Sequence, residues 1–346
     1  MGAPGRGRYP PAMRRLRVGL VYDLHGTYPR RAGDPPDVDA EHEPEETVAG
    51  LERALAGLGC QPVRLGAPHA LLARASQGGI PALDAALCIA EGRGTRNREA
   101  WGPVLLDLLE IPALGSDALT LSLSLDKAWT KAVAAAAGVP ALAHAVVRSE
   151  AEVHKARLPG PFPLFVKPRW EGTAKGIGPW SRVEDAASLA AAVARVTRDY
   201  RQPALVEPFL PGAEYTVAVI GNDPPRALPA LQRALEAATR IGVHALERFA
   251  PAEGFAHCAP GSLEPALEGR LAELAVRAFA ALECRDFARV DLRRDAHGEP
   301  WFLEINPLPS FARDGSFGIL AEVLGTSFEA LVGEVLASGL RRLGLR

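Results

Sequence analysis

The chain has 346 residues, a length that indicates two or three domains rather than one hydrophobic core. Hydrophobic residues make up 48% and charged residues 23%, as in a soluble globular protein, and a net charge of −2 excludes a global basic field that recruits nucleic acid. The four cysteines lie far apart without a C-x-x-C pair. This spacing argues against a zinc site or a disulfide framework and fits the cytoplasm.

The amino terminus is rich in arginine. The first 17 residues contain five arginines and no apolar segment, so we expect residues 1–15 to form a disordered basic tail rather than a secretory signal. Met1 and Met13 both remain candidate start residues. The longest apolar region, residues 132–147, is interrupted by glycine, proline and histidine. It is shorter than the ~20 apolar residues that a membrane span needs, and we expect no membrane contact.

Strands and helices alternate over the first third of the chain, which predicts a parallel α/β domain over residues 16–118. Its predicted elements are a strand at 16–22, a loop from 24 to about 44, a helix from Glu45 to Leu55, strands at 61–65 and 85–90, and an edge at 111–115.

Two further lobes are expected, at residues 119–205 and 206–346. The first contains a helix from about 125 to 137, a strand at 163–167, a glycine-bearing loop at 171–178 and a helix at 185–198. Strands at 204–207 and 214–220 lead into the second, where 222–261 is expected to be irregular and Ser262 to cap a helix with Pro265 in its first turn.

Residues 287–293 and 301–306 predict two strands of a hairpin. A four-residue loop at 296–299 pairs residue 295 with 300, and sets Asp291 opposite Glu304 and Arg289 opposite Asn306. Opposed side chains lie roughly 4.5–5.5 Å apart at Cβ. Two carboxylates that close repel by about 4 kcal/mol, and a hard cation such as Mg²⁺ removes the penalty. The alternative is that both acids face water and pair with Arg293 or Arg294.

Two lysines stand at positions that suit phosphate. Lys127 starts a helix, and Lys167 ends a strand before the loop that contains Gly172, Gly176 and Gly178, where backbone N–H groups can approach a polyphosphate. Only five lysines occur in the chain, which makes these two informative. Taken alone, each lysine could equally be solvated.

Residues 207–210, Glu-Pro-Phe-Leu, suit the edge of an adenine, with Phe209 and Leu210 as apolar walls. Glu214 follows after a turn and could accept hydrogen bonds from ribose hydroxyls. The alternative is that Phe209 and Leu210 belong to the core and that Glu207 and Glu214 are solvated.

In this order, the two lysines, the glycine loop, the Glu-x-Phe-Leu segment and the Arg-x-Asp and Glu-x-Asn hairpin resemble the ATP-grasp superfamily, and most closely the D-alanine–D-alanine ligase group. The resemblance covers nearly all of residues 16–340. It implies an N-terminal parallel α/β pre-ATP-grasp domain followed by a two-lobed α+β ATP-grasp fold.

The resemblance also implies a role for each motif residue. Lys127 and Lys167 would hold ATP phosphates under a lid formed by the loop, and Arg289 would steady the transferring phosphoryl group and the oxyanion. The lid includes Glu171, Gly172, Thr173 and Gly176; Glu207, Phe209 and Leu210 would frame adenine and Glu214 the ribose; Asp291, Glu304 and Asn306 would hold two Mg²⁺, or Mn²⁺.

The implied reaction is an ATP-dependent, ADP-forming ligation. A carboxylate attacks the γ-phosphate to give an acyl phosphate, and an amine then attacks that carbonyl to form an amide. Water would destroy the intermediate, so the site must close, and the glycine loop and residues 222–261 are the expected lids. The partners are small amino-acid or other carboxylate and amine substrates, and the resemblance leaves a homodimer open.

The substrate-binding residues match the family less well. Glu45, or Glu46, is expected to bind the amino group of the first substrate, and Arg248 to take the place of a lid lysine. Ser316 is expected to bind the carboxylate of the second substrate, with Arg313 as the alternative, and residues 91–96 replace a histidine-glycine motif. These departures put D-alanine in doubt as the substrate, and another amino-acid or peptide ligase is an equal interpretation.

Two rival classes remain. A non-catalytic ATP-binding regulatory protein could share the fold, although the Arg-x-Asp and Glu-x-Asn residues count against it. A nicotinamide-dependent enzyme is disfavoured, because no G-x-G-x-x-G follows the first strand.

Overall fold

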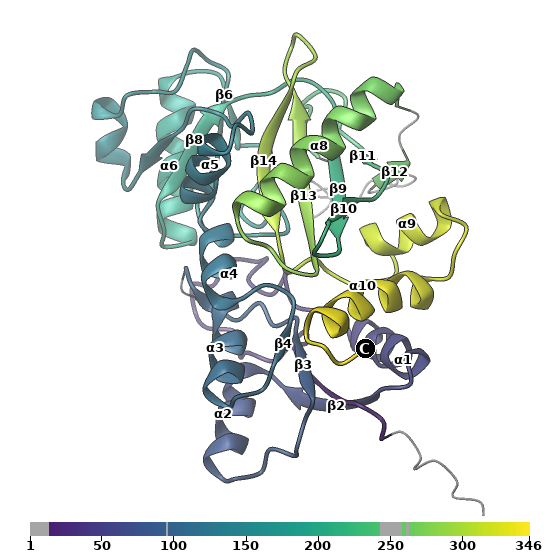
Figure 1. The fold of residues 1–346 in the computed structure, drawn as a ribbon. Coiled ribbons are helices and arrows are strands. Elements are labelled where there is room, and N and C mark those ends of the chain that lie inside the picture. Colours follow the sequence, from purple (N-terminus) through teal and green to yellow (C-terminus); the bar gives the residue numbers. More distant parts are fainter. Residues whose placement is uncertain (1–13, 95, 243–257, 261–262) are drawn as a thin grey trace, which may run out of the picture.

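The structure is a computed structural model that describes residues 14–94, 96–242, 258–260 and 263–346. Three sheets are present in these residues, one at the bottom of Figure 1 and two side by side above it. The expected tail lies outside the described residues except for its last two, of which Arg14 forms an ion pair with Asp84 at 2.7 Å.

The N-terminal sheet is parallel, in the order β2-β1-β3-β4, as the alternation of strands and helices predicts. The edge expected at 111–115 is confirmed, because a two-residue strand there forms one end of this sheet. The elements are β1 (Arg17–Val21), α1 (Glu45–Gly57), β2 (Gln61–Gly66), α2 (Pro68–Ser76), β3 (Ala85–Cys88), η1 (Arg98–Ala100), α3 (Trp101–Leu108) and β4 (Ala113–Leu114).

A pair of helices leads into the second sheet, where the sequence predicts one. Asp126 separates α4 (Ala118–Leu125) from α5 (Lys127–Ala136), and its carboxylate caps α5 by accepting from the backbone N–H groups of Ala128 and Trp129. The antiparallel sheet that follows has the order β5-β8-β6-β7. Its elements are β5 (Ala145–Val147), η2 (Glu150–Lys155), β6 (Leu164–Pro168), β7 (Arg182–Val183), α6 (Ala186–Asp199) and β8 (Ala204–Pro208).

The third sheet has the order β12-β11-β9-β13-β14, with β10 paired to β9. The expectation of irregular structure over 222–261 is wrong in part, because the described residues of this segment include three short strands. Helix α8 begins at Pro265 with Glu264 as its N-cap, and the predicted cap Ser262 lies outside the described residues. The elements are β9 (Glu214–Ile220), β10 (Arg226–Ala227), β11 (Leu231–Arg233), β12 (Cys258–Pro260), α8 (Pro265–Ala281), β13 (Phe287–Arg294), β14 (Pro300–Asn306), α9 (Ser316–Val323) and α10 (Phe328–Arg342).

The β13–β14 hairpin has the predicted register where it carries the site. Asp291 pairs with Glu304, and Arg289 with Asn306. The predicted pairing at the turn is wrong, because Arg294 rather than residue 295 pairs with Pro300. A bulge beside Asp291, with Leu303 as the extra residue, absorbs this one-residue difference and restores the register.

The last helix of the chain returns to the first domain. In Figure 1, α10 lies beside α1, and the two helices share a core with β1 and β3. Asp286, fully buried, joins these parts by accepting from the guanidinium of Arg342 at 2.8 Å and from the backbone N–H of Gly115 at 2.7 Å. Helix α8 crosses the third sheet, and its Leu271 and Leu274 pack on it.

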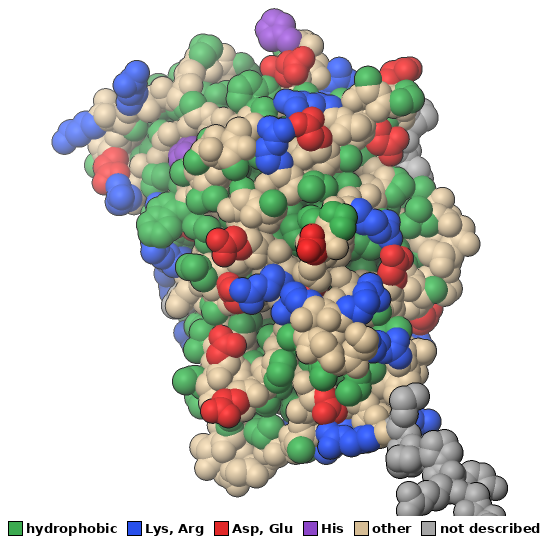
Figure 2. Space-filling view, viewed as in Figure 1, with side chains coloured by type: hydrophobic (Ala, Val, Ile, Leu, Met, Phe, Trp, Pro, Cys, Tyr) green, Lys and Arg blue, Asp and Glu red, His purple; other side chains and the backbone are tan. Residues whose placement is uncertain are grey.

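Charged side chains of both signs are interspersed with apolar ones on the face shown in Figure 2. Among the described residues, no helix has both the length and the apolar composition required to cross a membrane.

Candidate active site

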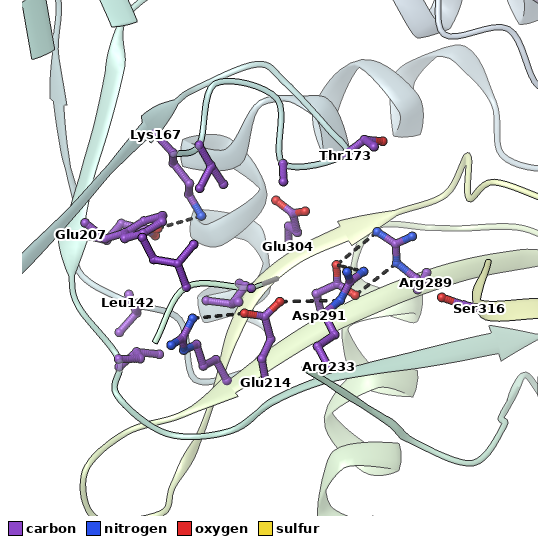
Figure 3. Close-up of a pocket in the computed structure, with 18 of the residues that line it drawn as sticks. Leu142, Lys167, Thr173, Glu207, Glu214, Arg233, Arg289, Asp291, Glu304 and Ser316 are labelled. Carbon is purple, nitrogen blue, oxygen red and sulfur yellow. Dashed lines mark hydrogen bonds and ion pairs between the residues drawn. The ribbon is translucent and has the colours of Figure 1, made fainter. Parts of the chain in front are cut away.

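A cavity of about 250 Å³ lies between the second and third sheets (Figure 3). Strand β6 and the glycine loop contribute one wall, and β9, β13, β14 and the start of α9 contribute the other. The cavity brings together ten of the predicted site residues, namely Lys167, Thr173, Glu207, Phe209, Leu210, Glu214, Arg289, Asp291, Glu304 and Ser316.

A smaller recess adjoins this cavity and shares Thr173 and Glu304 with it. Lys127, Gly172 and Asn306, three further predicted residues, line the recess. Most of the site residues that the sequence predicts therefore line either the cavity or the recess.

Glu207 is the most deeply buried acid of the cavity, with 2% of its surface exposed. Its carboxylate forms ion pairs of 2.8 Å with both Lys131 and Lys167, which excludes the solvated alternative. Burial raises the pKa of Glu207, but the two ammonium groups outweigh it and hold the pKa at about 2.

Sequence reasoning missed Lys131. Its ammonium also donates to the backbone carbonyls of Phe302 and Leu303, at 3.1 and 2.8 Å, and burial lowers its pKa to about 8. A signal was available, because Lys131 lies four residues after Lys127 and therefore on the same face of α5.

We expect the Glu207 ion pairs to make stability depend on pH. A carboxyl group whose pKa falls from 4.5 to about 2 on folding stabilises the protein above pH 4.5, and this contribution is lost as the pH falls towards 2. Glu207→Gln removes it and leaves two buried ammonium groups, which costs about 3–5 kcal/mol at neutral pH.

Urea unfolding between pH 6 and pH 3 measures this effect. The stability of the Glu207→Gln variant should fall less steeply below pH 4.5, by up to about 1.4 kcal/mol per pH unit. Equal slopes for the two proteins would show that Glu207 does not titrate on unfolding.

The predicted adenine segment lines the cavity. Leu210 is buried, while the ring of Phe209 is half-buried and lies under the guanidinium groups of Arg182 and Arg293, at 4.6 and 5.3 Å from its centroid. Glu214 pairs with Arg293 at 3.2 Å and with Arg233 at 3.6 Å, so it is not a solvated acid. Arg233 and Arg293 also line the cavity, although the sequence assigned neither of them to the site.

The hairpin acids also face cations inside the cavity. Arg289 donates from two nitrogens to the two carboxylate oxygens of Asp291, both at 3.2 Å, and Thr216 donates to Asp291 at 2.5 Å. Glu304 pairs with Lys127 at 3.0 Å. Burial raises the pKa of Glu304, but Lys127, then Lys167 and Arg289, lower it to about 2.

The alternative pairing of these acids at the surface is wrong. Arg293 pairs with Glu214, and Arg294 donates to the backbone carbonyl of Gly298 at 2.6 Å. Both hairpin acids therefore remain inside the site.

The metal prediction rests on two carboxylates and one amide. Among the described residues, no group of three or more His, Cys, Asp or Glu side chains is arranged around one point. The donors that the hairpin offers are Asp291, Glu304 and Asn306, and the amide oxygen of Asn306 accepts from the backbone N–H of Leu308 at 2.9 Å. An oxygen-only donor set fits a hard cation such as Mg²⁺, which keeps several water ligands.

The glycine loop differs from the prediction in how its N–H groups are used. The N–H of Gly172 donates to the carboxylate of Glu41 at 2.6 Å, and the N–H of Gly176 donates to Asp37 at 2.9 Å. These two amides are therefore bonded to the N-terminal domain, while Thr173 between them lines both hollows.

Glu45, which is expected to bind the amino group of the first substrate, lies on the surface. It is exposed and pairs with Arg64, and Glu46 is exposed as well. Glu43, two residues earlier, is buried, and its carboxylate accepts from Thr47 at 2.8 Å. Burial raises the pKa of Glu43, and a hydrogen bond from Ser310, a cavity residue, partly offsets this effect.

The structure distinguishes between Ser316 and Arg313, the two residues expected as alternatives to bind the carboxylate of the second substrate. Ser316 lines the cavity near Arg289, as Figure 3 shows. Arg313 is exposed, pairs with Glu329 and lies 5.0 Å from the ring centroid of Phe328, so it points away. Arg248 lies outside the described residues.

Comparisons with known proteins agree with this architecture. A family model described as the D-Ala–D-Ala ligase C-terminus matches residues 133–337. A D-alanine–D-alanine ligase of Alcanivorax borkumensis is 33% identical over 260 residues, which cover 75% of this chain and 78% of that protein.

Two solved structures have the same fold. One is a D-alanine–D-alanine ligase from Bacillus anthracis complexed with ATP, with a TM-score of 0.69, 18% identity, and coverage of 96% of this chain and 99% of that one. The other is the VanG D-Ala:D-Ser ligase from Enterococcus faecalis, with a TM-score of 0.68, 17% identity, and coverage of 94% and 100%.

The fold and the site define the ATP-grasp class of ligases. Within this class the chain belongs to the D-alanine–D-alanine ligase family, and it is an ATP-dependent, ADP-forming ligase of that type.

Proposed function

We propose that the chain joins a small carboxylate to an amine, with ATP and Mg²⁺, through an acyl phosphate. The observation that carries this proposal is the cavity in which Lys167, Glu304 and Arg289 face one another. Phosphoryl transfer depends on positioning and charge neutralisation more than on covalent protein chemistry, and this set of charges supplies both.

The nucleotide would lie between the second and third sheets. Glu207, Phe209 and Leu210 frame the adenine and Glu214 accepts from the ribose, while the loop containing Glu171, Gly172, Thr173 and Gly176 covers the phosphates. Lys127 and Lys167 exchange part of their contact with Glu304 and Glu207 for phosphate oxygens. Asp291, Glu304 and Asn306 would hold two Mg²⁺, or Mn²⁺, and these ions supply positive charge to the triphosphate and the attacking carboxylate.

The proposed reaction has two steps. A carboxylate oxygen of the first substrate attacks the γ-phosphorus of ATP, and the bond from this phosphorus to the bridging oxygen breaks to release ADP. The nitrogen of the second substrate then attacks the acyl carbon, the bond to phosphate breaks, and the nitrogen gives up a proton. Arg289 donates to the oxygens that gain negative charge in each step.

The substrates are proposed to be two amino acids or a short peptide and an amino acid. D-alanine is one candidate for both, but the ligand expected at Glu45 is on the surface and Glu43 occupies the buried position beside Ser310. The charge pattern at this end of the cavity therefore differs from the expected one, and a pair other than two D-alanines is an equal candidate.

The proposal extends to compartment and assembly. Cys60, Cys88 and Cys284 are buried free thiols, which suits the cytoplasm. Light scattering would measure whether the chain forms a homodimer. The chain is proposed to consist of three lobes, residues 16–118, 119–205 and 206–346. The last lobe contributes α10 to the hydrophobic core of the first lobe.

A screen of ADP release over pairs of D- and L-amino acids tests the proposed function. ADP should form when a carboxylate and an amine substrate are both present, and the product should have the mass of the two substrates less one water. Tight ATP binding without turnover across a broad panel would instead identify a non-catalytic ATP-binding regulatory protein.

A further inference from the structure

Two carboxylates of the N-terminal domain accept hydrogen bonds from the glycine loop, and neither carboxylate lines the cavity. Glu41 accepts from the N–H of Gly172 at 2.6 Å, and Asp37 accepts from the N–H of Gly176 at 2.9 Å. Tyr200, at the end of α6, donates to the other oxygen of Asp37 at 2.9 Å. Three residues, 38–40, separate these two carboxylates in the sequence, and their contacts lie on either side of the tip of the glycine loop.

The contact at Glu41 belongs to a buried network of charged side chains. Glu41 and Glu171 pair with Arg98 and Lys175. Glu99, 3.9 Å from Arg98, is a third acid of the network, and burial raises its pKa to about 7. The side chains of Glu41 and Arg98 are each 3% exposed and meet at 2.6 Å. Burial raises the pKa of Glu41, but Arg98 and then Lys175 lower it to about 2, which keeps the carboxylate charged at working pH.

Such a network is better suited to fixing the position of the glycine loop than to stabilising the folded protein. Buried ion pairs contribute little net stability, because desolvation offsets their attraction, but they tolerate only one arrangement of their partners. Arg98 also donates to the backbone carbonyl of Trp170 at 2.8 Å, directly before the loop. The network therefore holds the start of the loop at two points, the carbonyl of Trp170 and the N–H of Gly172.

The loop needs an external hold. Thr173 and Ala174, at its tip, have φ values of 47° and 52°, a left-handed conformation that non-glycine residues adopt at a cost. Both residues line the cavity. A contact on either side of this strained tip determines where it sits relative to Glu304 and the phosphate-binding lysines.

We propose that Glu41 and Asp37 are positioning residues that hold the glycine loop closed over the cavity and so keep water from the acyl phosphate. This inference rests on the proposed function. The chemistry predicts a specific defect: when the loop is released, water competes with the amine for the acyl carbon, and ATP is consumed without amide formation.

The first measurement is the ratio of ADP to amide in Glu41→Gln, Asp37→Asn and Lys175→Met. Wild-type protein should give about one ADP per amide, and Glu41→Gln should raise the ratio several-fold together with the KM for ATP. Lys175→Met weakens the same network from the loop side, so it should shift the ratio in the same direction. Asp39→Asn is the matched control, because Asp39 lies in the same segment but pairs with Arg30 near the surface.

The second measurement does not depend on turnover. In hydrogen exchange, the amides of Gly172 and Gly176 should lose about 10- to 100-fold protection in Glu41→Gln and Asp37→Asn, respectively, as expected for losing a charged acceptor, but not in Asp39→Asn. Folding of each variant is checked by circular dichroism. Unchanged protection in folded variants overturns the inference, and so does an unchanged ADP:amide ratio. A wild-type protein that forms no ADP with any substrate pair would contradict the proposed function, while the exchange result would still decide whether the carboxylates hold the loop.

Discussion

Glu304→Gln should lower kcat for ADP formation by about a thousandfold or more. Glu304 lines both the cavity and the adjoining recess, pairs with Lys127 at 3.0 Å and lies opposite Asp291 in the hairpin. Glutamine keeps the size of the side chain and removes its charge, so the proposed Mg²⁺ site loses an anionic ligand and Lys127 loses its ion-pair partner. Charge neutralisation in such a site is worth several kcal/mol, and each 1.36 kcal/mol is about tenfold in rate.

The measurement is a coupled assay of ADP release at saturating Mg²⁺ with the best substrate pair. Glu299→Gln is a matched control, because Glu299 is an exposed acid at the turn of the same hairpin. A folded Glu304→Gln protein that retained more than about a tenth of the wild-type kcat would remove Glu304 from the proposed metal site.

The sequence predicts those parts of the site that depend on local geometry. Alternation along a strand is enough to put Asp291 on the same face as Arg289, and Glu304 on the same face as Asn306. The bulge at Leu303 was missed, and the pairing at the turn was placed one residue away from its observed position. Two errors of one residue cancelled, and the prediction was right where the site lies.

Helix α4 shows how tertiary context overrides local pattern. Residues 118–125 read Ala-Leu-Thr-Leu-Ser-Leu-Ser-Leu, an alternation more typical of a strand. In the structure Asp117 caps a helix by accepting from the N–H of Thr120 at 3.0 Å, and the buried hydroxyl of Thr120 donates to the carbonyl of Leu282 at 3.1 Å. The partner is 162 residues away along the chain, which no local pattern reveals.

The substrate end was least predictable for the same reason. Glu41 and Glu45 are close in sequence and are the same residue type, yet Glu41 is buried against Gly172, 131 residues away, and Glu45 is on the surface with Arg64. The sequence singles out the glycine loop, and Thr173 and Ala174 of this loop line the cavity, but the partners of its N–H groups at Gly172 and Gly176 come from another domain. Family resemblance carries the ATP chemistry, while the choice of substrate depends on such long-range contacts.

Arg289→Lys should lower kcat by about 10²–10³-fold with a much smaller change in the KM for ATP. The guanidinium of Arg289 donates from two nitrogens to both oxygens of Asp291, a fork that a single ammonium group cannot reproduce. The proposed role is to donate to oxygens that gain charge only as the phosphoryl group moves and the tetrahedral oxyanion forms. An interaction made mainly in the transition state affects kcat rather than KM.

Arg294→Lys provides the matched control on the same strand, since the guanidinium of Arg294 donates to the carbonyl of Gly298 outside the cavity. Steady-state kinetics with the best substrate pair measure both variants. If Arg289→Lys raised the KM for ATP and left kcat unchanged, Arg289 would contribute equally to ground-state and transition-state binding. The catalytic charge would then have to come from another cation of the same cavity, of which Arg233, 3.8 Å from Asp291, is the nearest described candidate.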